Sequence, residues 1–179
     1  MESSMHLIFS HGHVSSPDSH KIRTLAPLAE QAGWNTRAID YRDLRDDPGG
    51  RVDRLCAELT RLDQPTVLVG SSMGGYVSVA AACRIPVRGL FLLAPAVYLN
   101  DRYPDAGLIE EHYPVQSGPI TVVHGWRDDT IPWQHARRFA EERRAALHLL
   151  DTDHGMHSAM DKISRLFEGF LLGLGGGAR

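Results

Sequence analysis

The fold is decided by one stretch near the middle of the chain, Thr66-Val67-Leu68-Val69-Gly70-Ser71-Ser72-Met73-Gly74-Gly75. Its first half is a short apolar run typical of a buried strand. Residues 74–83, which follow, are almost free of charge and rich in small side chains, as in a helix packed tightly on a sheet. The turn between them carries the pattern Gly-x-Ser-x-Gly, in which the glycines remove side chains that would collide around the serine. This setting predicts Ser72 as a nucleophile on a strained turn, with the backbone N–H of Met73 facing a developing oxyanion.

A plainer interpretation of the same stretch is a glycine-rich helix start that only packs, or that binds an anion. The chain lacks the glycine patterns of dinucleotide-binding and Walker loops. The strand and helix on either side of the turn favour the nucleophile.

Outward from this stretch, apolar runs of strand length alternate with amphipathic segments of helix length. The expected strands are residues 6–10, 35–40, 66–70, 88–93, 120–124 and 146–150, and the expected helices are residues 21–32, 52–62, 74–83, 132–144 and 159–172. This alternation predicts an α/β fold with a parallel sheet of about six strands covered on both faces. A chain of 179 residues is expected to form a single domain over residues 1–174, with a flexible glycine-rich tail at 175–179.

Parallel sheets bind ligands at the carboxyl ends of their strands, so the loops there should hold the partners of the serine. A serine hydroxyl needs a base to take its proton and a third group to orient that base. The loop after the strand at 120–124 offers Asp128 and Asp129 as acids, and the loop after the strand at 146–150 offers His154 and His157 as bases.

These segments resemble the α/β-hydrolase superfamily. Its members carry His-Gly-x-x-Asp-x-x-Val-Pro after the strand that supplies the acid, and the matching residues here are His124, Gly125, Asp128, Ile131 and Pro132. The resemblance assigns the acid to Asp128, with Asp129 as the competitor. Through the pair Asp153-His154 it assigns the base to His154, with His157 as the competitor.

The loop after the first strand, residues 10–19, is similar to the oxyanion loop of small bacterial esterase-like members of this superfamily. The resemblance implies that the backbone N–H of His13 is the second oxyanion donor beside Met73, and that Gly12 lies against the substrate. It also implies a minimal three-layer αβα sandwich that lacks the two N-terminal strands common in the superfamily. Only residues 94–117 are available where many relatives insert a cap, so no cap domain is expected. His11 and His124 are expected to be hydrogen-bonded structural histidines.

Other side chains on the same loops are candidates to line an apolar substrate site, although each is equally compatible with the core or the surface. They are Tyr98, Leu99, Trp126, Thr130 and Met156.

The function expected from these residues is hydrolysis of a small acyl ester by a Ser72–His154–Asp128 triad through an acyl-enzyme, without cofactor or metal. A thioesterase, an amidase or a lactone hydrolase would use the same triad. Two other classes stay open: a non-catalytic or slow-turnover ligand-binding module on the same scaffold, and a metal-dependent hydrolase that uses His11, His13, His154 and His157.

The partner expected from the triad is a small-molecule acyl substrate, and composition argues against other classes of partner. The chain has 19 basic and 22 acidic residues and a net charge of −3, which argues against nucleic-acid binding. The longest nearly apolar stretch, residues 89–99, is about half of the ~20 residues that a membrane-spanning helix needs.

The N-terminus lacks the basic segment of a secretory signal, and Cys56 and Cys83 suit reduced thiols, so a cytoplasmic location is expected. The protein is expected to be a monomer or homodimer.

Overall fold

The computed structural model describes residues 5–99 and 112–175, which contain a six-stranded, fully parallel sheet in the order β2-β1-β3-β4-β5-β6. The strands are β1 (His6–Ser10), β2 (Asn35–Ile39), β3 (Val67–Ser71), β4 (Gly89–Leu93), β5 (Ile120–Gly125) and β6 (Ala146–Leu150). Each lies within one residue of its predicted bounds. Val67, Leu68 and Val69 of β3 are buried, as are all five residues of β4, as expected where helices cover both faces of a sheet.

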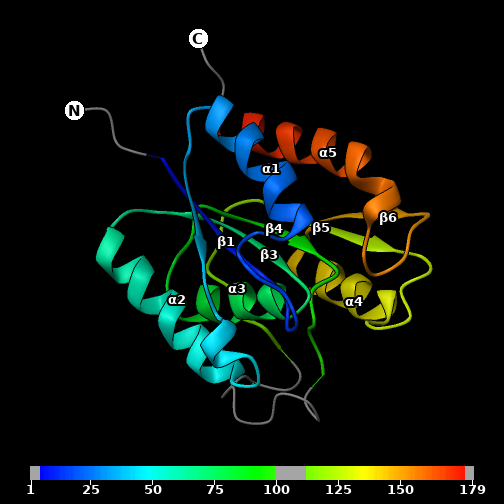
Figure 1. Ribbon diagram of the computed structural model, residues 1–179, viewed down its shortest axis with the longest axis horizontal. Coiled ribbons are helices and arrows are strands. Elements are labelled where there is room, and N and C mark those ends of the chain that lie inside the picture. Colours follow the sequence, from blue (N-terminus) through cyan, green and yellow to red (C-terminus); the bar gives the residue numbers. More distant parts are fainter. Residues whose placement is uncertain (1–4, 100–111, 176–179) are drawn as a thin grey trace.

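Helices cover the two faces of this sheet and complete the three-layer sandwich (Figure 1). They are α1 (His20–Gln31), α2 (Pro48–Leu62), α3 (Met73–Arg84), α4 (Trp133–Arg143) and α5 (Met160–Gly173), with short 3₁₀ helices η1 (Arg42–Leu44) and η3 (His157–Ala159). One core cluster joins the sheet to α1 and α5, and the other joins it to α2, α3 and α4. The predicted three-layer αβα sandwich with a parallel sheet of six strands is therefore confirmed.

The start of α2 is the largest difference from the predicted helices. This helix begins at Pro48 and not at residue 52, because the Asp47 side chain accepts a hydrogen bond from the N–H of Gly50 and Pro48 occupies the first turn. Two glycines at 49 and 50 interrupt the amphipathic pattern and hide this first turn in the sequence. Arg51 therefore belongs to the helix.

The glycines of the Gly-x-Ser-x-Gly pattern let α3 approach the sheet closely. A Cβ added to Gly74 would overlap the backbone carbonyl of Ser10 in β1, and a Cβ added to Gly70 would overlap the carbonyl of Gly74. Only glycine fits at these two positions, since the obstructing atoms belong to backbone. The turn that carries Ser72 is thus held between β3 and the first turn of α3.

The long connection between β4 and β5 is described only at its ends. Residues 94–99 and 112–117 contain no helix, while residues 100–111, where the absence of a cap was predicted, lie outside the described residues. Residues 176–179 of the predicted tail also lie outside them. Over the parts of the chain that are described, every helix falls short of the length and apolar character needed to cross a membrane.

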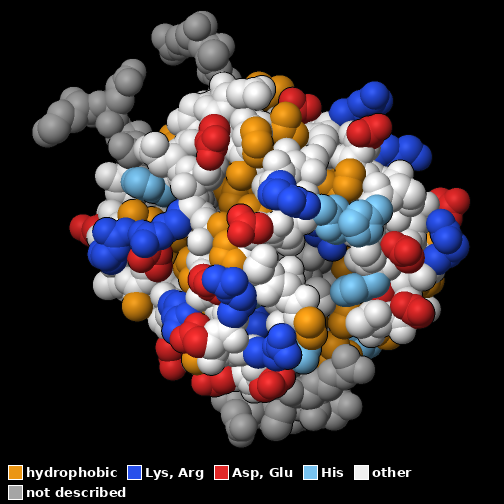
Figure 2. All heavy atoms as spheres, viewed as in Figure 1, with side chains coloured by type: hydrophobic (Ala, Val, Ile, Leu, Met, Phe, Trp, Pro, Cys, Tyr) orange, Lys and Arg blue, Asp and Glu red, His pale blue; other side chains and the backbone are white. Residues whose placement is uncertain are grey.

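Charged side chains of both signs are interspersed over the face seen in Figure 2. Basic side chains form no continuous stripe on this face, in keeping with the near balance of 19 basic and 22 acidic residues.

The close approach of α3 predicts a difference between two helical glycines. We expect Gly74→Ala to lower the free energy of unfolding by about 3 kcal/mol, because the new methyl group collides with backbone that cannot relax. Gly169→Ala in α5, where nothing lies within 4 Å of an added Cβ, should raise it by up to about 1 kcal/mol. Urea denaturation measures both. Equal stability of Gly74→Ala and the wild type would contradict the close approach.

Candidate active site

Ser72 lies on the turn between β3 and α3, with backbone angles φ 53° and ψ −119°. A positive φ is strained for a residue other than glycine and costs on the order of 1–3 kcal/mol. Two long-range backbone hydrogen bonds oppose this strain: the Ser72 N–H donates to the carbonyl of Leu93 at 2.9 Å, and the Ser72 carbonyl accepts from the N–H of Ala96 at 3.0 Å. The end of β4 and the loop after it therefore hold this turn in place through backbone hydrogen bonds.

Three side chains from different loops form one hydrogen-bonded chain at the carboxyl edge of the sheet. His154, after β6, has its Nε2 3.1 Å from the Ser72 hydroxyl and its Nδ1 2.7 Å from Oδ2 of Asp128, which follows β5. The competing residues lie elsewhere. Asp129 is exposed and accepts a bond from the Thr130 hydroxyl, and the ring of His157 stacks on His20 at 3.6 Å.

The Asp128 carboxylate is fully buried and accepts hydrogen bonds at both oxygens. Oδ1 accepts from the backbone N–H groups of Thr130 at 2.9 Å and Ile131 at 2.8 Å, while Oδ2 accepts from His154 and lies 3.1 Å from Nε2 of His124. Burial alone would raise the pKa of Asp128. The hydrogen bonds from His124, His154 and Ile131 outweigh burial and hold this pKa well below its usual range. Asp128 therefore stays ionised throughout the neutral range.

The lysine of α1 adds a second charge near this carboxylate. Burial lowers the pKa of Lys21, and the negative charges of Asp128 and Asp153 counteract part of that shift. The ammonium therefore contributes positive potential close to the buried acid.

Two buried histidines shape the loops beside the serine. His124 lies with Nε2 2.9 Å from the carbonyl of Ile131, so this nitrogen carries the proton and donates. The Nε2 of His11 accepts from the N–H of Tyr41 at 3.0 Å, and its Nδ1 donates to the carbonyl of Gly12 at 2.8 Å. Burial lowers the pKa of His11 and favours this neutral form.

The loop after β1 lies against the serine. A Cβ built on Gly12 would be 3.6 Å from the Cβ of Ser72. The His13 ring points away to the surface, where Nε2 lies 2.6 Å from Oδ1 of Asp46. Met73 is the first residue of α3, where a backbone N–H has no acceptor within the helix, and its side chain is buried in the core. The two residues predicted to supply oxyanion donors thus lie next to Ser72 at the start of α3, for Met73, and next to Gly12 on the loop after β1, for His13.

The five side chains predicted to line the substrate site have different surroundings. Trp126 is half exposed, with its ring 4.9 Å from that of Trp133, and Thr130 is exposed. Leu99 is half-buried and packs against the core, and the Tyr98 hydroxyl donates to Glu142 of α4 at 2.9 Å. Met156 is fully buried in the core beneath α1 and α5, which corrects the prediction that its side chain lines an open site. The Met156 backbone is left-handed, with φ 61°, and the side chain belongs to the core.

The four histidines of the metal-dependent alternative do not come together. The nitrogens of His11 bond to backbone, His13 faces Asp46, and His154 and His157 have separate partners. Within residues 5–99 and 112–175, no three His, Cys, Asp or Glu side chains are grouped as metal ligands. The geometry therefore gives the metal alternative no support.

Sequence reasoning missed the buried arginine that supports the loop after β1. The side chain of Arg51 is fully buried, and its guanidinium donates to backbone carbonyls of this loop. An arginine in the first turn of an amphipathic helix has the pattern of a surface residue. No sequence signal marks it for burial.

Comparisons with known proteins show which family this chain belongs to. The sequence profile of an uncharacterised protein family, UPF0227, matches residues 6–114. A crystal structure from the alpha/beta hydrolase superfamily, of Xanthomonas campestris, is 32% identical, with a TM-score of 0.80 over 94% of this chain and 99% of that one. The chain belongs to UPF0227 and to the α/β-hydrolase superfamily.

Two further proteins resemble this chain, one in fold and one in sequence. Est1E from Butyrivibrio proteoclasticus, solved with ferulic acid bound, has the same fold at 14% identity, with a TM-score of 0.86 over 96% of this chain and 90% of that one. The uncharacterized protein YfhR of Escherichia coli O157:H7 is 24% identical over 83% of this chain. The chain spans 62% of the length of YfhR.

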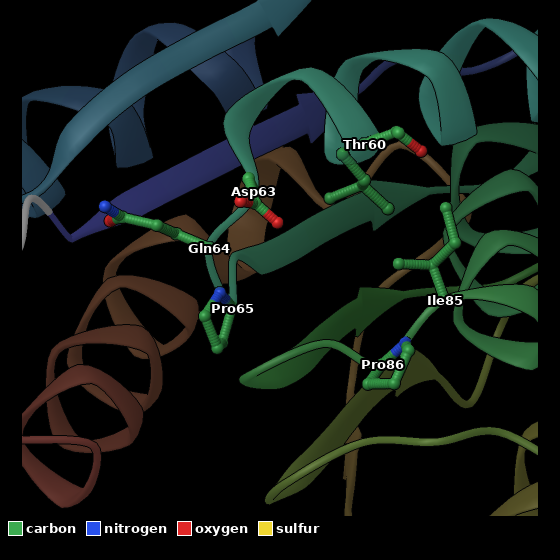
Figure 3. A pocket seen from close by; sticks show the side chains of 7 residues that line it. Thr60, Asp63, Gln64, Pro65, Ile85 and Pro86 are labelled. Atoms are coloured by element: carbon green, nitrogen blue, oxygen red, sulfur yellow. The ribbon is translucent and has the colours of Figure 1, made fainter.

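A separate pocket of about 360 Å³ lies at the opposite edge of the sheet. It is lined by the end of α2 and by the residues just before β3 and β4, among them Asp63, Pro65 and Pro86 (Figure 3). In parallel α/β folds the chemistry lies beyond the carboxyl ends of the strands, and this pocket lies at their amino ends. We therefore place the candidate active site at Ser72.

The hydrogen bonds of Asp128 predict a pH-dependent contribution to stability. We expect Asp128→Asn to lower the free energy of unfolding at pH 7 by about 2 kcal/mol, the scale of hydrogen bonds to a charged acceptor. Because the pKa of Asp128 is depressed in the folded state, this contribution is present above the unfolded value of about 3.9 and is lost as the pH falls below it. Asp129→Asn should change stability by less than about 0.5 kcal/mol.

Urea denaturation of the three proteins between pH 7 and pH 3 measures these differences. The gap between the wild type and Asp128→Asn should narrow below about pH 4. A gap that stays constant down to pH 3 would contradict the hydrogen-bonded, ionised state of Asp128.

Proposed function

We propose that this protein is a serine hydrolase that cleaves small acyl esters through an acyl-enzyme. Ser72 is the nucleophile, His154 the general base and Asp128 the acid that orients the base. One observation carries the proposal: the continuous hydrogen-bonded chain from the Ser72 hydroxyl to His154 at 3.1 Å and on to Asp128 at 2.7 Å. Its geometry meets the requirements of a nucleophile, a base and an orienting group.

The reaction begins when the Ser72 oxygen attacks the acyl carbonyl carbon and His154 takes the hydroxyl proton at Nε2. Asp128 accepts the hydrogen bond from Nδ1, holds the ring in this orientation and stabilises the imidazolium that forms. The negative charge on the carbonyl oxygen is stabilised by the backbone N–H groups of Met73 and His13. His154 then returns its proton to the leaving alcohol, which departs from the acyl-enzyme.

Hydrolysis of the acyl-enzyme repeats the same steps with water. His154 removes a proton from the water as its oxygen attacks the acyl carbon, and the proton passes to the Ser72 oxygen as the ester bond to the enzyme breaks. The products are a carboxylic acid and free serine. Because Asp128 is ionised throughout the neutral range, it supports both half-reactions.

The ester is assigned by the likeness of the loop at residues 10–19 to that of small esterase-like hydrolases. Thioesters, amides and lactones demand the same oxyanion chemistry, so a substrate panel ranks them. The exposed Thr130 and half-exposed Trp126, on the loop that carries Asp128, favour a small substrate at an open site.

The first test labels the nucleophile. A fluorophosphonate should modify the wild type and Ser71→Ala, the matched control one residue away, but not Ser72→Ala. Turnover of p-nitrophenyl acetate by Ser72→Ala should fall by about 10⁴-fold or more, because the triad acts as a unit. Labelling that survives in Ser72→Ala would remove the proposal. Labelling without turnover of any ester, thioester, amide or lactone would favour the binding-module alternative.

The second test separates the two neighbouring acids. We expect kcat to fall by about 10⁴-fold in Asp128→Asn, because an amide favours the wrong histidine tautomer, and to change less than about threefold in Asp129→Asn. Steady-state kinetics on variants with wild-type circular dichroism provides the measurement. A larger loss in Asp129→Asn would move the acid to the neighbouring position.

A further inference from the structure

The buried guanidinium of Arg51 binds the loop after β1 through consecutive carbonyls. Its Nη1 donates to the carbonyls of His11 and Gly12, and its Nη2 donates to the carbonyl of His13, each at 3.2 Å. Nη2 also donates to the carbonyl of Arg45 at 3.2 Å, and Nε to that of Leu44 at 2.8 Å. One side chain from α2 therefore joins the loop after β1 to the segment after β2.

The orientation of the Gly12 carbonyl determines the direction of the next N–H group. In a trans peptide the C=O of one residue and the N–H of the following residue point in opposite directions. Because the Gly12 carbonyl faces Arg51, the N–H of His13 points away from Arg51. Gly12 itself lies beside Ser72, since a Cβ built on it would be 3.6 Å from the Cβ of Ser72. We therefore infer that the His13 N–H, on the side of this peptide away from Arg51, is available to a substrate bound at Ser72.

A second side chain holds the same carbonyl. Nδ1 of His11 donates to the Gly12 oxygen at 2.8 Å, and the position of this ring is fixed by the bond from the Tyr41 N–H to Nε2. The Arg51 guanidinium lies over the Tyr41 ring, 5.3 Å from its centre. Gly12 therefore accepts two hydrogen bonds from buried side chains that are themselves held in place.

We propose that Arg51 is a positioning residue for the oxyanion site: it fixes and polarises the Gly12–His13 peptide so that the His13 N–H is preorganised toward the transition state. This inference rests on the proposed function. A cation at the carbonyl strengthens the N–H of the same amide as a donor. Donors fixed before the reaction need no reorganisation as charge develops, so the effect falls on kcat more than on substrate binding.

Arginine suits this role because its planar fork presents donors in fixed directions, whereas lysine offers a single point charge. Arg51→Lys therefore keeps the charge and removes most of the carbonyl bonds. The matched control is Arg54→Lys on the same helix, because Arg54 is partly exposed and binds the Asp40 carbonyl and the Asp43 carboxylate, outside the loop after β1.

The test measures kcat and KM for p-nitrophenyl acetate in the two variants and the wild type. For Arg51→Lys we expect kcat to fall about 10- to 100-fold and KM to change less than about twofold, while Arg54→Lys stays within about twofold of the wild type in both. The affinity for phenylboronic acid, which forms a tetrahedral adduct on serine, should weaken in Arg51→Lys by a factor similar to the loss in kcat. A folded Arg51→Lys with wild-type kcat, or with a raised KM alone, overturns the inference.

If Arg51→Lys does not fold, a measurement on the wild-type protein tests the role of Arg51. The Nε–H nuclear magnetic resonance signal of Arg51 should shift when a phosphonate adduct forms on Ser72, while that of Arg54 should not, and an unchanged Arg51 signal overturns the inference. Ser72→Ala separates the two claims. Full activity in Ser72→Ala means that the proposed function has failed, whereas Ser72-dependent activity with an unimpaired Arg51→Lys means that only the role of Arg51 has failed.

Discussion

The site depends on the contact between Gly74 and the carbonyl of Ser10, where the first turn of α3 meets β1 without room for a side chain. This contact makes the turn before α3 sharp, and the sharp turn gives Ser72 its positive φ. Strain of this kind persists only where the surrounding structure over-determines it. Here the hydrogen bonds of Ser72 to Leu93 and Ala96 do so, since both belong to β4 and its following loop. Ser72, the proposed nucleophile, is therefore positioned by backbone from β1, β3 and β4 together.

Buried polar groups surround this turn, and their hydrogen bonds explain why they are tolerated. An ionised side chain without partners in the interior would cost several kcal/mol. Asp128 accepts hydrogen bonds from backbone N–H groups at Oδ1 and from the His154 ring at Oδ2. Arg51 donates from all three of its guanidinium nitrogens. The two charges are satisfied in different ways: Asp128 by donors from the loops after β5 and β6, and Arg51 by carbonyls from the loops after β1 and β2. The loops beside Ser72 are thus ordered by separate networks, one around Asp128 and His154 and one around the loop after β1.

The features of the fold and site that can be predicted from the sequence are those that depend on a local pattern of residues. Strands lie within one residue of their predicted bounds because short apolar runs between amphipathic segments mark them. Ser72, Asp128 and His154 could be predicted to meet because each follows a strand in a recognisable motif, and the structure brings the three side chains together. The burial of the Met156 and Arg51 side chains could not be predicted, because it depends on tertiary packing. A methionine on a loop carries no sign that it turns inward, and an arginine at the start of a helix carries no sign that backbone carbonyls will gather around it.

The pair His-Gly occurs at the ends of both β1 and β5, and the structure explains why the same pair serves both loops. His11 places Nδ1 on the carbonyl of Gly12, and His124 places Nε2 on the carbonyl of Ile131, with Oδ2 of Asp128 3.1 Å from the same nitrogen. Each ring thereby folds its loop back over the strand end. The two glycines differ in the space around them: a Cβ on Gly125 would overlap the carbonyl of Thr152, whereas one on Gly12 would be in ordinary van der Waals contact with Ser72 at 3.6 Å. At β5 the histidine therefore holds the following loop while the glycine lets the chain after β6 approach, and at β1 the histidine alone imposes the shape of the loop.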